Sequence, residues 1–186
     1  MNRIRMNRIR LNRIAFALAL VASLTSVGLA QSSTPAAQST ESSCPASTTL
    51  DELIKALDDA VSGPADKDRT CMRGLMTPDA RLIPVVKAPD GNYVPHPLTV
   101  DGWIEAVRKH TGNIFYERQV KYATEQYGHI AHLWSTYEVR PTPDGKATVR
   151  GINSIQTVND GKGWKVIEIV WEAESPGEPV PEKYLP

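Results

Sequence analysis

The sequence predicts an α+β fold, in which helices and strands occupy separate parts of the chain. Amphipathic helical patterns dominate the first half, and four strand-like segments of about ten residues or more fill the second half. The order contains no alternation of strand, helix and strand, so a parallel α/β sheet is not expected. Four strands joined by short turns predict one antiparallel, twisted sheet that needs helices on one face.

The first helix is predicted between Thr49 and Gly63. Thr49 and Glu52 have the spacing of a capping box, in which each side chain bonds the backbone of the other residue. Five apolar residues fall on one helical stripe: Leu50, Leu53, Ile54, Leu57 and Val61. Gly63 and Pro64 end the helix.

A shorter helix and a hairpin are predicted next. Residues 66–76 carry a second apolar helical side, which Thr77-Pro78 ends. Residues 81–86 have the pattern of a strand, and the Pro-Asp-Gly turn at 89–91 returns the chain to a short partner at 92–95. Pro84 donates no backbone hydrogen bond, so this strand is expected to be an edge strand or to be bulged there.

A third helix and four long strands complete the predicted domain. Thr99 caps a helix that extends through His110, and Gly112 closes it. Turn sequences rich in Gly, Asp and Pro then separate four strand-like segments. These segments are 115–127, 130–140, 148–158 and 164–173.

The segments outside residues 49–174 differ from the domain in composition. Residues 1–30 combine five arginines with an uncharged apolar run that ends in Gly-Leu-Ala, which predicts a secretory signal peptide and export. The alternative is an uncleaved membrane anchor, and Met6 is an alternative start. Residues 31–48 predict a flexible tether, and residues 175–186, with four prolines, an irregular tail.

The charge distribution excludes one class of function. The chain has 21 basic and 21 acidic residues, but five of the basic residues lie in residues 1–30, where there is no acid. The remainder is acidic, whereas a nucleic-acid-binding protein needs a concentrated basic surface. We therefore expect no nucleic-acid partner. Because the apolar run belongs to the predicted signal peptide, we also expect no stable membrane anchor once that peptide is removed.

Cys44 and Cys71 are the only cysteines of the chain. An even pair in an exported protein favours a disulfide, which would close a loop of about 28 residues. The alternative is two independent thiols, because spacing alone does not show that the two α-carbons come within bridging distance.

The order of elements over residues 49–174 resembles the nuclear-transport-factor-2-like (NTF2-like) superfamily, which includes ketosteroid isomerase and SnoaL-like proteins. The helix 49–61 carries this resemblance, together with three strand sequences: GHIAHLWSTYE at 128–138, RGINSIQ at 150–156 and DGKGWKVI at 160–167. The resemblance implies a cone-shaped domain with three N-terminal helices over a curved, mostly antiparallel sheet and a pocket at its open end. It also implies a homodimer packed through the sheet.

The candidate catalytic residue is Glu138, as a general base. A carboxylate desolvated by Trp or Tyr gains a raised pKa that suits proton abstraction. Glu168 and Glu172 are alternative bases. The competing interpretation is that Arg150, on the next strand, forms an ordinary ion pair with Glu138.

The candidate ligand-binding residues come from the last three predicted strands. They are His132, Trp134, Tyr137, Arg150, Asn153 and Trp171. No metal site is expected, because His129 and His132 point to opposite faces of a strand and no further His or Cys has ligand spacing. No cofactor motif is present either.

Three functions remain open from these observations. The first is an exported domain that binds a small, largely apolar molecule. The second is a cofactor-free enzyme of lyase or isomerase type that uses a Glu as general base. The third is a structural or interaction module whose cone is filled by its own side chains.

Overall fold

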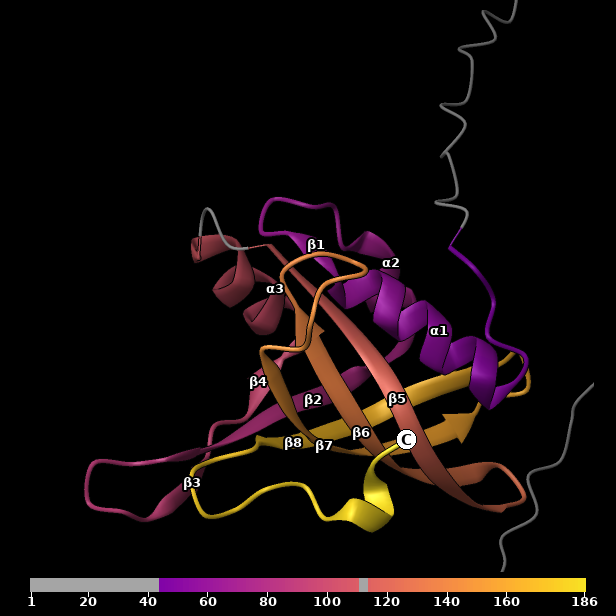
Figure 1. Ribbon diagram of the computed structural model, residues 1–186. Helices are drawn as coiled ribbons and strands as arrows, with labels where there is room; N and C mark the ends of the chain where they lie inside the picture. Colours follow the sequence, from indigo (N-terminus) through magenta and orange to yellow (C-terminus); the bar gives the residue numbers. More distant parts are fainter. Residues whose placement is uncertain (1–43, 111–113) are drawn as a thin grey trace, which may run out of the picture. The chain divides into compact units, whose positions relative to one another are not determined.

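A single mixed sheet organises the domain in the computed structural model, which describes residues 44–110 and 114–186. The strand order is β1-β5-β6-β7-β8-β2-β3, with β4 also paired to β2 (Figure 1). All pairings are antiparallel except that of β2 with β8. The strands are β1 Gly63–Pro64, β2 Met76–Lys87, β3 Tyr93–Pro95, β4 Leu98–Thr99, β5 Ile114–Tyr127, β6 Ile130–Arg140, β7 Val149–Asn159 and β8 Trp164–Ala173.

Three α-helices accompany the sheet in the described residues. They are α1 Leu50–Val61, α2 Thr70–Gly74 and α3 Val100–Lys109. The capping box of α1 is present, with the Glu52 backbone N–H donating to Thr49 Oγ1 at 3.2 Å. Thr99 caps α3 in the same way, through the backbone N–H of Gly102 at 3.0 Å. The predicted α+β class and mostly antiparallel sheet are therefore confirmed.

The second helix is shorter than predicted. It ends at Gly74, and Met76 already belongs to β2, which pairs in parallel with Val166 of β8. The backbone N–H of Val166 donates to Leu75 O at 2.9 Å, so pairing with a distant strand takes these residues out of the helix. β2 is also not an edge strand, because it lies between β8 and β3, and its irregularity falls between Met76 and Arg81 rather than at Pro84.

The hydrophobic core lies between the helices and one face of the sheet. We call this face the inner face; Leu133 of β6 and Ile155 of β7 lie on it and are almost fully buried. The helices contribute Leu53, Ile54, Leu57, Ala60, Met72, Val100 and Ile104 to the same cluster. The opposite face, which carries Trp134 and Ser154, is called the outer face.

The predicted disulfide joins Cys44 to Cys71, with the two α-carbons 5.2 Å apart. It fixes the last residues of the predicted tether beside α2. Ser47, in the same segment, is buried and accepts a hydrogen bond from the Trp164 backbone N–H at 2.6 Å. Residues 44–48 therefore pack along the domain. The predicted signal peptide and the rest of the tether lie outside the described residues.

The C-terminal segment lies along the outer face. Thr136 of β6 is almost fully buried there and donates a hydrogen bond to Tyr184 O at 2.7 Å. The rings of Trp134 and Tyr184 are 6.1 Å apart, and Val180 is buried. The segment is mostly irregular, as the prolines predict, with one 3₁₀ turn at Glu182–Tyr184. It covers part of the face that a dimer packed through the sheet would use.

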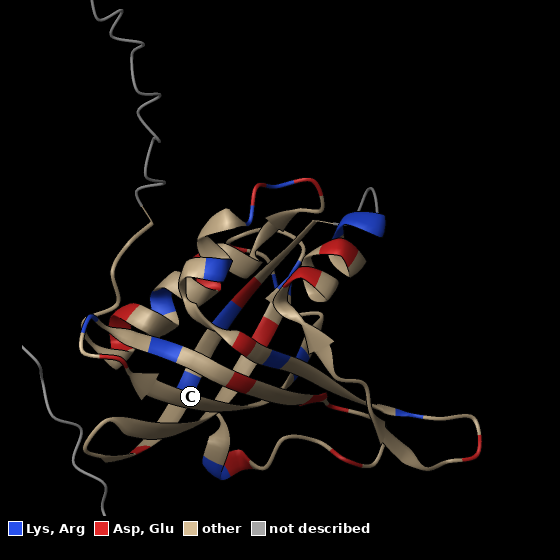
Figure 2. Ribbon diagram, turned by 180° about the vertical axis from the view of Figure 1, so that it is seen from behind, with Lys and Arg blue, Asp and Glu red and all other residues tan. Residues whose placement is uncertain are grey.

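Acidic and basic residues are interspersed along the elements of the domain rather than gathered on one of them (Figure 2). Within the described residues, no helix is long and apolar enough to cross a membrane.

Gly151 of β7 has no room for a side chain, and this gives a first testable prediction. A β-carbon at this position would lie 2.7 Å from the Tyr137 hydroxyl and 2.8 Å from Ala173 Cα, and it would also meet the Glu172 carbonyl oxygen. We expect Gly151→Ala to lower the free energy of unfolding by about 1–3 kcal/mol, as overpacking does. Urea denaturation measures this. Gly161→Ala is not a suitable control because Gly161 has a positive φ, whereas Gly74→Ala is, since only Cys44 Cβ lies within 4 Å, at 3.9 Å.

Candidate functional site

A small cavity lies between the helices and the inner face of the sheet. Its volume is about 50 Å³, which leaves room for only a few non-hydrogen atoms. Most of its wall is apolar, and two side chains, Glu117 and Asn153, are polar. The lining residues are Val61, Met72, Leu82, Trp103, Glu117, Asn153, Ile169 and Trp171.

Glu117 of β5 is the titratable group of this cavity. Its Oε1 accepts hydrogen bonds from Gln119 Nε2 at 3.1 Å and from Asn153 Nδ2 at 3.3 Å. Desolvation is the largest influence on the carboxyl group, and the nearby Asp58 carboxylate adds repulsion. Together they raise the pKa of Glu117 to about 7, against the two hydrogen bonds that lower it.

Asp58 of α1 is a second carboxylate nearby; it is buried, whereas Glu117 is half-buried, and the backbone of β5 holds it. The Gln119 N–H donates to Asp58 Oδ1 at 3.2 Å and to Oδ2 at 3.1 Å. Burial raises the pKa of Asp58 to about 6, although these hydrogen bonds and the Arg118 charge lower it. Two carboxyl groups with raised pKa values therefore lie close together, Asp58 buried and Glu117 half-buried.

Polar side chains of β5, β6 and β7 connect this region. Ser135 Oγ donates to Gln119 Oε1 at 2.6 Å, and Asn153 Nδ2 donates to the same oxygen at 3.2 Å. Ser135 and Asn153 pair across β6 and β7, so both lie on the inner face. The network holds the amides of Gln119 and Asn153 with their N–H groups toward Glu117.

Loop residues between α1 and α2 hold one wall of the cavity in place. The buried Arg69 donates to four backbone carbonyl groups, those of Val61, Pro64, Ala65 and Lys67, at 3.1–3.3 Å. Its guanidinium carbon lies 5.9 Å from the centre of the Trp103 ring, which lines the cavity. One side chain thus links the loop to the aromatic wall.

Glu138, the residue predicted as general base, lies away from this cavity. Glu138 Oε2 accepts a hydrogen bond from Arg140 Nη2 at 2.7 Å, and Oε1 accepts one from Arg150 Nη2 at 2.7 Å. These bonds keep the pKa of Glu138 below its ordinary value. The contacts favour the ion-pair interpretation over a role in proton abstraction.

The structure divides the predicted ligand-binding residues between three places. Asn153 and Trp171 line the interior cavity, and Tyr137 is buried on the same face. Trp134 lies on the outer face, where His132 Nε2 is 3.1 Å from Ser154 Oγ. Arg150 is engaged by Glu138. Glu168 and Glu172, the alternative bases, are not among the residues that line the interior cavity.

Glu117, Gln119 and Asp58 were not predicted as site residues. For Asp58 a signal existed, because it lies within the apolar stripe of α1, four residues after Ile54 and one turn before Ser62. A charged residue in an otherwise apolar stripe marks a buried polar contact. For Glu117 there was none, since the irregular register between Gln119 and Lys121 changes which residues of β5 point inward.

Metal binding has no candidate in the described part of the chain, where no group of three or more His, Cys, Asp or Glu residues could hold an ion.

Solved structures resemble this chain in fold at low sequence identity. An NTF2-like protein of unknown function from Pseudomonas putida KT2440 aligns with a TM-score of 0.52 and 13% identity, over 74% of this chain and 94% of its own. A protein from Thiobacillus denitrificans, described as a calcium/calmodulin-dependent protein kinase type II association domain, aligns with a TM-score of 0.51 and 9% identity. That alignment covers 70% of this chain and 99% of the other. No family model and no curated protein sequence matches the chain.

Proposed function

The chain has the NTF2-like fold, and we propose that it binds a small molecule in the interior cavity, where Glu117 acts as general base. The observation that supports this most directly is the Glu117 carboxylate in the cavity wall, with its pKa raised to about 7. A base with such a pKa is about half deprotonated at neutral pH and still strong enough to remove a proton. This is the cofactor-free alternative of lyase or isomerase type, with Glu117 in place of Glu138.

The two oxygens of Glu117 are available for different tasks. Oε1 accepts both amide hydrogen bonds, from Gln119 and Asn153. Oε2 has no hydrogen-bond partner in the part of the chain that the structure describes, so it is the oxygen that would take the proton. The amides would fix the orientation of the carboxylate, and deprotonated Asp58 nearby would raise its basicity.

The cavity limits the class of substrate. Its volume of about 50 Å³ admits only a small molecule, or the reacting end of a larger one. The walls made by Met72, Trp103 and Trp171 suit an apolar carbon skeleton. A carbon acid, with a C–H group next to a carbonyl, is the class that such a base can deprotonate.

Export and architecture belong to the same proposal. The Cys44–Cys71 disulfide supports an oxidising compartment, and with it a signal peptide at residues 1–30 and a tether that begins at residue 31. We take the interior cavity to be the pocket of a cone formed by the helices and the curved sheet. The homodimer through the sheet would form beside the C-terminal segment.

Deuterium exchange tests the proposed base without knowledge of the natural substrate. Small ketones and esters are incubated with the protein in D₂O, and incorporation at the α-carbon is followed by NMR. We expect Glu117→Gln to lower the exchange rate of a responsive compound by about 10²–10⁴-fold, and Glu138→Gln to leave it within a factor of about two.

Two results would contradict the proposal. One is exchange that Glu117→Gln leaves unchanged. The other is a Glu117 side chain that titrates near the ordinary value of 4.5 when its carboxyl carbon is followed by ¹³C NMR. The small volume of the cavity favours a second candidate function, an interaction module whose interior is filled by its own side chains. A protein that catalyses no exchange and whose Glu117 titrates near 4.5 would support that candidate.

A further inference from the structure

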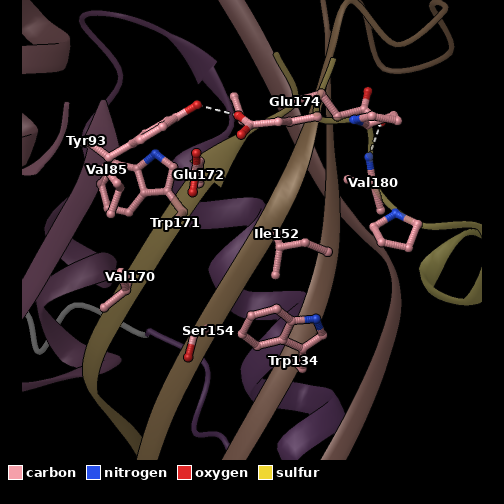
Figure 3. A pocket seen from close by; sticks show the side chains of 14 residues that line it. Val85, Tyr93, Trp134, Ile152, Ser154, Val170, Trp171, Glu172, Glu174 and Val180 are labelled. Atoms are coloured by element: carbon pink, nitrogen blue, oxygen red, sulfur yellow. Dashed lines mark hydrogen bonds between the residues drawn. The ribbon is translucent and has the colours of Figure 1, made fainter. Parts of the chain in front are cut away.

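A second and larger cavity lies on the outer face of the sheet. Its volume is about 540 Å³, within the range of small-molecule sites. We call it the outer groove; β6, β7 and β8 form its floor, the C-terminal segment forms a wall, and Val85 of β2 and Tyr93 of β3 also line it (Figure 3). Its lining residues are Val85, Tyr93, Trp134, Ile152, Ser154, Val170, Trp171, Glu172, Ala173, Glu174, Glu178, Pro179, Val180 and Pro181.

The floor of the outer groove is apolar, with one small residue at its centre. Ser154 lies between Trp134 and Val170 in the register of β6, β7 and β8. Its side chain is shorter than those of these two apolar neighbours, and Figure 3 shows the three residues together with Ile152. This floor fits a flat or extended hydrocarbon body.

The C-terminal wall is held in place by its own contacts. The Val180 backbone N–H donates to Glu174 Oε1 at 2.9 Å, and the Val180 side chain is buried. Further along, Lys121 Nζ donates to Leu185 O at 2.6 Å, and Thr136 Oγ1 to Tyr184 O at 2.7 Å. The outer groove is thus bounded by a wall that is fixed at several points, and a ligand would not have to order it.

The charged residues of the outer groove are all acidic. The lining includes three glutamates and no Lys, Arg or His. Glu178 is engaged by the hydroxyl groups of Tyr93 and Ser175, and Glu174 by the Val180 backbone. Glu172, next to Ile152 in register, has no hydrogen bond or ion pair among residues 44–110 and 114–186. Two cations lie nearby: Lys87 Nζ is 5.3 Å from the centre of the Tyr93 ring, and Lys183 Nζ is 4.7 Å from that of Tyr184. The pKa of Glu178 is lowered mainly by the hydrogen bonds from Tyr93 and Ser175, with a smaller contribution from the charge of Lys87.

We propose that the outer groove binds a hydrophobic organic cation, with its apolar body over Ser154 between Trp134 and Val170 and its ammonium group at Glu172. The charge of the lining favours a cation over an anion, and the exposed Glu172 carboxylate is available to pair with the ammonium group. The aromatic face of Trp134 adds attraction for a positively charged or aromatic group. This site lies on the opposite face of the sheet from Glu117 and does not depend on the proposed proton transfer.

Three probes with one carbon skeleton test the charge requirement. They are 4-phenylbutylamine, which is a cation at pH 7, 4-phenylbutanol and 4-phenylbutanoate. Binding is measured by calorimetry, and its place by the indole N–H signals in ¹H–¹⁵N NMR, assigned with Trp134→Phe. We expect the amine to bind most tightly, the carboxylate least, and the Trp134 signal to shift.

Matched charge variants test the role of Glu172. We expect Glu172→Gln to weaken binding of the amine about fivefold, the upper range for an exposed ion pair, and to leave binding of the alcohol unchanged. Glu182→Gln is the control, because Glu182 lies in the same C-terminal segment but does not line the groove. Circular dichroism melting verifies that both variants fold.

The proposal is overturned if the three probes bind equally, or if Glu172→Gln and Glu182→Gln have the same effect. It is also overturned if the probes shift the Trp103 signal instead, which would place them in the interior cavity. A fourth contrary result is a Trp134 signal that changes with protein concentration while light scattering shows a dimer without any probe. The occupant of the outer groove would then be a second copy of the chain.

Discussion

Removal of the Cys44–Cys71 disulfide is expected to lower the free energy of unfolding by about 3–4 kcal/mol. The bond closes a loop with a sequence separation of 27 residues, which restricts the unfolded chain by roughly that amount in the loop-entropy model. It also holds the segment that contains Ser47 against β8, through the hydrogen bond from Trp164. Denaturant unfolding of a Cys44→Ala/Cys71→Ala variant measures the loss.

Unfolding of the wild-type protein in the presence of a reducing agent is the control for this prediction. In its presence the wild type should unfold at the same denaturant concentration as the double variant, because both chains then lack the bond. A variant as stable as the oxidised wild type would show that the disulfide contributes nothing to stability. A single Cys71→Ala variant is less informative, since it leaves Cys44 able to form intermolecular disulfides.

The local elements were predictable because their signals are local. The helix α1 is specified by a capping box and a 3.6-residue stripe, and α3 by Thr99 and the stripe that follows it. The bounds of β5, β6, β7 and β8 agree with the prediction within one residue at each end. Long strands separated by Gly-containing turns have few alternative arrangements.

Pairing between distant segments could not be read from the sequence. β2 joins β8 in parallel, almost ninety residues later in the chain, and this pairing shortened α2 and placed Pro84 in an inner strand. Nothing in the local pattern of residues 76–87 specifies that partner. The prolines predicted an irregular tail but not its packing on the outer face, where Val180 is buried and the Tyr184 ring lies 6.1 Å from that of Trp134.

The site was harder to predict than the fold because it depends on which face of each strand points inward. Alternation divides the side chains of each strand between two faces, but it does not say which face meets the helices. Irregular register at Gln119/Lys121 and at Gln156/Thr157 breaks the alternation within two strands. Residue type does not distinguish Glu117 from Glu138, so the prediction of Glu138, Glu168 or Glu172 as the base did not include Glu117.

Glu117→Gln is expected to make the protein more stable at pH 8 by about 2–3 kcal/mol while it removes the proposed base. The pKa of Glu117 is about 7 in the folded protein and near 4.5 in the unfolded chain. Between these values the folded state binds more protons, so the wild-type free energy of unfolding falls as the pH rises from 4.5 to 7. The neutral glutamine avoids this loss, and the two proteins should be about equally stable at pH 4.5.

Urea unfolding at several pH values between 4.5 and 8 measures this difference. Some pH dependence remains in the variant because Asp58, with a pKa of about 6, stays in place.

Glu138→Gln provides a control of opposite sign. The pKa of Glu138 is lowered in the folded protein, so the contribution of its charge is present above pH 4.5 and is lost as the pH falls through that lowered value. This variant should be less stable than the wild type at pH 8. If the Glu117→Gln and wild-type curves were parallel, Glu117 would have an ordinary pKa, and the chemistry proposed for the interior cavity would have no base.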